Sequence, residues 1–112
     1  MASLDTIFDL LGDERRRYVL YYLEEQEDAV PVSELVEKVA DWESNASEDE
    51  IPADKFRSVR VSLVHNDLPK TADVEFIEYD TDEGMVKIEG TPTEFDTILN
   101  LAKIIEDPES NE

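Results

Sequence analysis

The chain has 112 residues and no cysteine, which excludes a disulfide framework, a thiolate zinc site and a cysteine nucleophile. It carries 30 Asp and Glu residues against 10 Lys and Arg residues, so its formal net charge is −20 at pH 7. No apolar run approaches the roughly 18 residues of a membrane span, and the first residues lack the features of a signal peptide. We therefore expect a cytoplasmic protein without a membrane partner.

The acidic residues are spread along the chain between apolar positions at regular spacing, which predicts a folded domain rather than an acidic disordered region. This distribution is typical of proteins from extreme halophiles. In molar salt the Debye length is about 3 Å, so the net charge alone does not exclude binding to nucleic acid.

The first two predicted helices follow each other closely. Ser3 is a candidate N-cap for a helix over residues 4–11, whose apolar face holds Leu4, Ile7, Phe8 and Leu11. Asp13 is the candidate N-cap of the next helix, which contains a run of three arginines, 15–17. These arginines either pair with nearby acids, which we favour, or contact phosphates.

A short edge strand is predicted at Val30, because Pro31 has no N–H to donate to a neighbouring strand. A helix over residues 33–43 follows, with core residues Leu35, Val36, Val39 and Trp42 at helical spacing. The connection over residues 44–51 is long for a helix-turn-helix motif, whose turn usually has three or four residues.

Residues 53–70 are locally cationic, and the first part of this segment predicts a helix over residues 53–66. Phe56, Val59 and Leu63 form the apolar side. The opposite side holds Lys55, Ser58, Ser62 and His65, a set suited to contacts with phosphates and base edges. Arg57 lies at the margin of the apolar side, where it forms either an intramolecular ion pair or, like Lys70 beyond the helix, a contact with a flanking phosphate. Arg60 points toward the apolar side, which favours an intramolecular ion pair, and His65 is either a structural hydrogen-bonding group or a DNA contact.

A proline-marked break at Leu68–Pro69 precedes a predicted β-hairpin, with strands over residues 74–79 and 85–89 around an acidic loop, 80–84. The last predicted helix runs to about Glu106, before Pro108. Its wide apolar stripe predicts a dimer contact through Phe95, Ile98, Leu99, Leu101 and Ile105; alternatively, the helix over residues 4–11 covers the stripe. Residues 1–107 form one predicted domain, and residues 108–112 an acidic frayed tail.

The order of elements predicts an α+β, mostly α fold: a winged helix-turn-helix with a two-stranded β-hairpin wing and a C-terminal helix. Three stretches carry a family resemblance over residues 4–106: LGDERRRYVLYYL, VADWE and VSLVHNDLPKTADVEFIEYD. They resemble a haloarchaeal winged-helix family of unknown function and, distantly, bacterial ArsR-type regulators. This resemblance implies transcriptional regulation, without a known ligand or operator.

The expected function is a dimeric DNA-binding transcriptional regulator of a halophilic archaeon, with the helix over residues 53–66 in the major groove of double-stranded DNA. The alternative is a winged-helix module that binds a protein partner and not DNA. We expect no enzyme, cofactor or metal site, because the sequence has no nucleophile elbow, phosphate-binding glycine loop or cluster of metal ligands.

Overall fold

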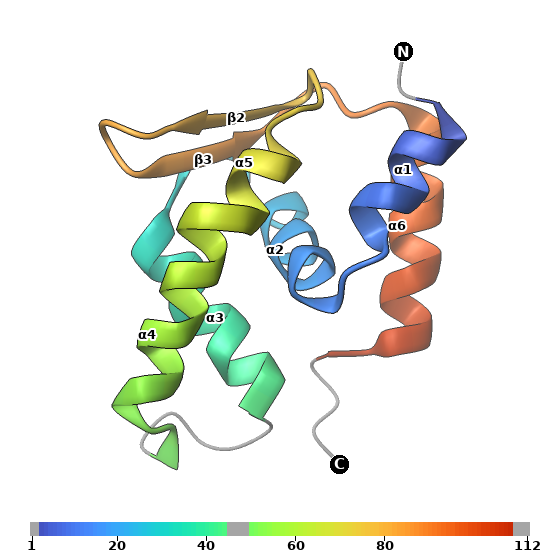
Figure 1. The fold of residues 1–112 in the computed structure, drawn as a ribbon. Helices are drawn as coiled ribbons and strands as arrows, with labels where there is room; N and C mark the ends of the chain where they lie inside the picture. Colours follow the sequence, from blue (N-terminus) through green and yellow to red (C-terminus); the bar gives the residue numbers. More distant parts are fainter. Residues whose placement is uncertain (1–2, 45–49, 109–112) are drawn as a thin grey trace.

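The computed structural model describes residues 3–44 and 50–108, and within them the chain is mostly helical with one small sheet (Figure 1). The helices are α1 (Leu4–Leu11), α2 (Glu14–Glu24), α3 (Val32–Ser44), α4 (Ala53–Ser62), the π-helical segment η2 (Leu63–Asp67), α5 (Leu68–Thr71) and α6 (Thr93–Glu106). The strands are β1 (Val30–Pro31), β2 (Ile77–Asp80) and β3 (Met85–Ile88). The predicted α+β, mostly helical class is confirmed. None of the described helices is long and apolar enough to cross a membrane.

The three strands form an antiparallel sheet in the order β1-β3-β2. Val30 pairs with Val86 of the central strand, and Ile77 pairs with Ile88 across the hairpin. The predicted edge strand at Val30 is therefore present. The hairpin loop ends at Gly84, whose φ of 64° lies in the left-handed region that glycine adopts without strain.

Side-chain caps fix the starts of the first two helices. The hydroxyl of Ser3 accepts a hydrogen bond from the backbone N–H of Thr6 at 3.1 Å. The carboxylate of Asp13 accepts from the backbone N–H groups of Arg15 and Arg16 at 2.9 and 3.3 Å. Both predicted N-caps are confirmed, because a cap is a local interaction that the neighbouring residues determine.

One apolar core joins α1, α2, α3, the α4–α5 segment, α6 and the sheet. On α1 the predicted face is partly wrong, because Leu10 is buried whereas Leu4 and Phe8 are 55% and 53% exposed. Aromatic rings fill the middle of the core: Tyr18 meets Trp42 edge-on at 5.6 Å.

The inner face of α6 contributes to this core, which corrects two of the predicted dimer contacts. Phe95 and Leu99 are 0% and 1% exposed, and the ring of Phe95 lies 4.7 Å from that of Phe76. They are already covered within one copy of the chain and cannot meet a second copy. At the end of α6, Glu106 accepts hydrogen bonds from Arg17 at 2.8 Å and from the hydroxyl of Tyr21 at 2.7 Å.

Other α6 positions remain accessible. Leu101 and Ile105 are 57% and 77% exposed, and Ile98 is half-buried. Pro108, the first residue of the predicted tail, is buried, and the rest of that tail lies outside the described residues.

The predicted helix break before Lys70 is wrong. Residues 53–71 follow one continuous helical path through α4, η2 and α5 (Figure 1). Within η2 the turn is wider, because the N–H of Leu68 donates to the carbonyl of Leu63, five residues earlier. This wider turn directly precedes Pro69, which has no N–H and would clash with the preceding turn of a regular α-helix.

Candidate nucleic-acid interface

Glu43, near the end of α3, sets which side of α4 faces the core. Its carboxylate accepts two hydrogen bonds from Arg15 of α2, both at 2.6 Å, and one from Lys55 of α4 at 2.8 Å. The Glu43 side chain is 9% exposed, so the interaction lies between the three helices rather than on the surface. Burial acts to raise the pKa of Glu43, but the hydrogen bonds from Arg15 and Lys55 outweigh it and hold the pKa below its ordinary value.

A second buried carboxylate, Asp67 of η2, faces the same side of the helix. It is 4% exposed and accepts a hydrogen bond from the hydroxyl of Ser62 at 2.7 Å. Burial raises its pKa, and the Ser62 hydrogen bond offsets only part of this effect. The polar side chains of Lys55 and Ser62 are therefore accommodated on the inward side of α4 by two acids.

These contacts correct the predicted DNA-binding face. Lys55 and Ser62 point to internal partners, whereas Ser58 and His65 are exposed as predicted. Arg57 is also exposed, and the ion pair that it forms within the described part of the chain is a 3.4 Å contact with the exposed Asp54 one turn earlier. Lys70 pairs with Asp9 of α1 at 2.6 Å, an interaction that lowers the pKa of Asp9 and links α5 to α1.

The predicted orientation of Arg60 toward the apolar side is wrong. Arg60 is exposed, and within residues 3–44 and 50–108 no carboxylate lies within ion-pair distance of its guanidinium. The sequence predicts Arg60 near the core because Phe56, Val59 and Leu63 define the apolar side of the helix. The inward side also includes Lys55 and Ser62, which turns Arg60 toward solvent. No local signal gives this rotation, because it depends on Glu43 of another helix.

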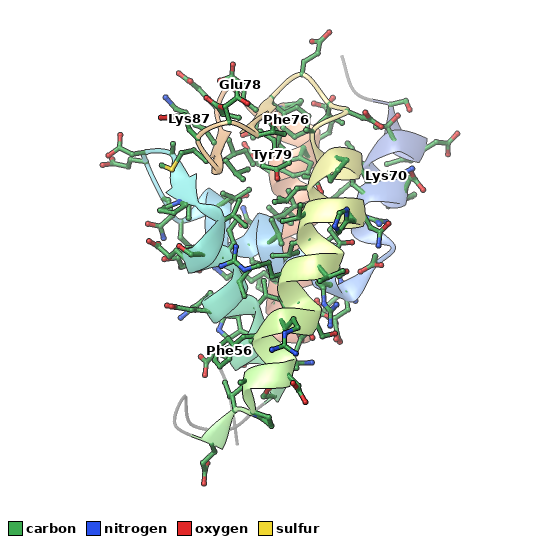
Figure 2. The ribbon with its side chains drawn as sticks, turned by 60° about the vertical axis from the view of Figure 1, so that its left-hand side comes forward. Phe56, Lys70, Phe76, Glu78, Tyr79 and Lys87 are labelled. Carbon is green, nitrogen blue, oxygen red and sulfur yellow. The ribbon has the colours of Figure 1, made fainter. Side chains whose placement is uncertain are left out.

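Arg57 and Arg60 border a surface hollow of about 410 Å³ between α3 and α4. Its floor is partly apolar, with Val36 of α3 and Phe56 of α4, and Ser33 and Glu37 complete its rim. Phe56 lies between these two helices on the side that Figure 2 turns forward. The arrangement places two guanidinium groups beside the start of α3, on a face that an anionic ligand can approach.

The loop of the β2–β3 hairpin is negatively charged, in contrast to the two arginines beside the hollow between α3 and α4. Asp80, Asp82 and Glu83 of this loop are exposed, and one Asp80 oxygen accepts from the backbone N–H groups of the other two. The cation of the hairpin, Lys87, lies opposite Glu78 in the register and forms an ion pair with Glu89 at 3.3 Å (Figure 2). The hairpin loop therefore repels phosphates at low salt.

A larger hollow, of about 510 Å³, lies elsewhere, between the start of α1 and the connections that flank the sheet. Its charged lining consists of Asp73, Glu75 and Glu89, with no cation among its lining residues. Such a hollow does not suit an anionic ligand. Among the described residues, no three His, Asp or Glu side chains gather in a way that could hold a metal ion.

Comparison with protein families gives a match to a domain of unknown function, DUF7344, over residues 8–87. The chain belongs to the DUF7344 family. The DUF7344 match runs from α1 to β3 and so includes the Glu43 contacts, the outward face of α4 and the hairpin, but not α6. No curated protein and no solved structure shows significant similarity to the chain.

Removing the Glu43 carboxylate tests whether it holds α4 in place. Because the pKa of Glu43 is depressed in the folded chain, its carboxylate stabilises the fold above its ordinary pKa, and this contribution is lost as the pH falls through the depressed value. We expect Glu43→Gln to lower the free energy of unfolding at neutral pH by about 2 kcal/mol, less than for a fully buried pair. Denaturant unfolding in concentrated KCl measures this, and the difference from wild type should shrink in acid.

Asp67→Asn is the matched comparison, because the pKa of Asp67 shifts the other way. A raised folded pKa means that the ionised carboxylate destabilises the fold at neutral pH. We therefore expect Asp67→Asn to leave the free energy of unfolding unchanged or to raise it at neutral pH. The difference from wild type should disappear at a pH low enough for Asp67 to be protonated in both the folded and the unfolded chain. Equal losses of stability in the two variants would contradict the assigned roles.

Proposed function

We propose that the chain is a DNA-binding transcriptional regulator of winged helix-turn-helix type, with the outward face of α4 in the major groove. The observation that carries this proposal is the pair Arg57 and Arg60, which are exposed on that face. Most other cations form closer ion pairs with acids of the same chain, namely Arg15, Arg17, Lys55, Lys70, Lys87 and Lys103. Arg57 and Arg60 are thus the cations best placed for phosphates.

The order of elements supports the same reading. In a winged helix, α3 and α4 correspond to the helix-turn-helix pair, with α4 as the recognition helix and the β2–β3 hairpin as the wing. In this proposal the first helix of the pair, α3, crosses the DNA backbone, and the hollow between α3 and α4 faces a phosphate. Because the hairpin loop is acidic, the proposed grip on DNA comes from α4 and the start of α3 rather than from the wing.

The acidic surface fits a protein that works in concentrated salt, and we propose a halophilic archaeon as its source. In molar salt, charges more than about 3 Å apart are screened. The 30 acids then repel DNA only where they touch it, and the contact surface around Arg57 and Arg60 decides binding.

The proposal includes a homodimer formed through α1 and α6. The exposed large apolar side chains on these helices are Leu4, Phe8, Leu101, Ile104 and Ile105. Both helices lie on the side of the molecule away from α4 (Figure 1), so a second copy there leaves the DNA-facing surface free. A second copy that covers these side chains would remove their exposed apolar surface from water, which favours association.

The alternative function is a protein-binding module without DNA binding. The exposed acids of the hairpin loop favour it, because three carboxylates at a projecting tip suit a cationic protein partner. This alternative predicts that the arginines of α4 are dispensable.

Charge reversal on α4 separates the two functions. We expect the double variant Arg57→Glu, Arg60→Glu to lose the promoter peaks that the tagged wild-type chain gives in genome-wide crosslinking in cells of its source organism. In vitro, its affinity for DNA in concentrated KCl should fall by at least about tenfold, since two phosphate contacts become repulsive. Both arginines are exposed, so the variant should unfold at the same denaturant concentration as wild type.

Lys87→Glu is the matched control, since it reverses a cation on β3 of the hairpin, which the proposal gives no part in holding DNA. It should keep the promoter peaks. A folded wild-type chain that gives no peaks, or a double variant that keeps them, would overturn the DNA-binding proposal and favour the partner-binding module.

The dimer is tested by charging its proposed contact. We expect the wild-type chain to have the mass of a dimer in concentrated KCl by light scattering, and Ile104→Glu, Ile105→Glu to have the mass of a folded monomer, because unpaired carboxylates would be buried between the copies. Val61→Glu, at an exposed apolar residue of α4, should remain dimeric. A monomeric wild type, or a dimeric Ile104/Ile105 variant, would exclude this interface.

A further inference from the structure

Val61 lies on the outward face of α4, one residue before the end of that helix, and is 52% exposed. Its neighbours on that face are Arg57, one turn before, and His65, one turn after, with Ser58 beside them. The other large hydrophobic side chains that are exposed in the described part of the chain lie on α1 and α6. Val61 is thus set apart from the proposed dimer contact.

Neither helix propensity nor complete burial favours a valine at this position. In a helix, valine is less favourable than alanine or the long charged side chains, because its branched Cβ loses rotamer freedom. Half of its surface contacts no part of the fold. In a chain where 36% of the residues are charged, a helix position that faces solvent is most readily filled by a charged residue. The exposed methyl groups of Val61 therefore suggest an apolar contact outside the chain.

If α4 enters the major groove as proposed above, Val61 meets the edges of the base pairs there. The one apolar group that unmodified bases present in the major groove is the C5-methyl group of thymine. We infer that Val61 contacts a thymine methyl group, so that the chain prefers a T·A pair beneath the C-terminal end of α4. This inference rests on the proposed function and adds to it the base that α4 recognises.

Arg57 and Arg60 then hold the helix against phosphates, while Ser58 and His65 lie within reach of the polar edges of neighbouring bases. The methyl group of 5-methylcytosine lies at the same place in the groove as that of thymine. The contact of Val61 is therefore with the methyl group, whichever of the two bases carries it. The experiment below distinguishes thymine from 5-methylcytosine.

The test is a double-mutant cycle between protein and DNA. Duplexes that bind the wild-type chain are first selected from a random-sequence library in concentrated KCl. The best duplex is then remade with uracil in place of each thymine in turn, which removes only the methyl group. We expect uracil at one thymine of each half-site to weaken wild-type binding by about fourfold, the equivalent of one buried methyl group. Val61→Ala should bind the thymine duplex more weakly and no longer distinguish uracil from thymine at that position.

Two controls isolate the contact. Val61→Ala should melt no lower than wild type, because alanine is the better helix former at an exposed position. Ser58→Ala, on the same face, should retain the full effect of uracil. Replacing the sensitive T·A pair by 5-methylcytosine paired with guanine should restore more affinity than unmethylated cytosine does.

The outcomes separate this inference from the proposed function. If no sequence is selected, both fail. If duplexes are selected but uracil is tolerated at every position, or if Val61→Ala retains the uracil effect, the methyl contact is excluded while DNA binding stands.

Discussion

The carboxylate of Glu43 is the constraint on which the proposed interface depends. It lies on α3 and accepts hydrogen bonds from Arg15 of α2 and Lys55 of α4, so one side chain joins the three helices. Because it is 9% exposed, salt screens these interactions less than it screens pairs on the surface. The same contact pairs Lys55, whose side chain is 30% exposed, with an acid of α3 and leaves the Arg57–Arg60 side of α4 toward solvent.

Because the composition is strongly acidic, the positions of the few cations determine where the chain can bind an anion. Ten cations face 30 acids, and most of the cations hold helices together within the chain, as Arg17 holds Glu106 and Lys70 holds Asp9. Exposed ion pairs contribute little to stability, and less in concentrated salt. Arg60, which has no carboxylate within ion-pair distance among residues 3–44 and 50–108, is therefore the kind of residue that such a chain can use to bind a phosphate.

The sequence predicted the features that neighbouring residues determine, and failed where distant residues decide. The bounds of α1, its Ser3 cap and the edge strand at Val30 depend on caps, spacing and a proline, all of which are local. In contrast, Phe95 lies in the core because Phe76 and other residues distant in the sequence cover it. The periodicity of α6 does not show which part of its wide apolar stripe such residues cover. The inward position of Lys55 has the same origin. From the sequence alone, a lysine is expected at the surface. Lys55 instead points inward because Glu43, a buried acid on another helix, is its partner.

The most direct test of the account is a nuclear magnetic resonance titration of the isotope-labelled chain with duplex DNA in concentrated KCl. The account predicts that signals from the Arg57 and Arg60 guanidinium groups and from the outward backbone positions of α4 shift with added DNA. It predicts that the Arg15 guanidinium signal, held by Glu43, stays in place. Shifts confined to the hairpin loop or to α6, or no shifts at all, would contradict the claim that α4 carries the DNA-binding surface.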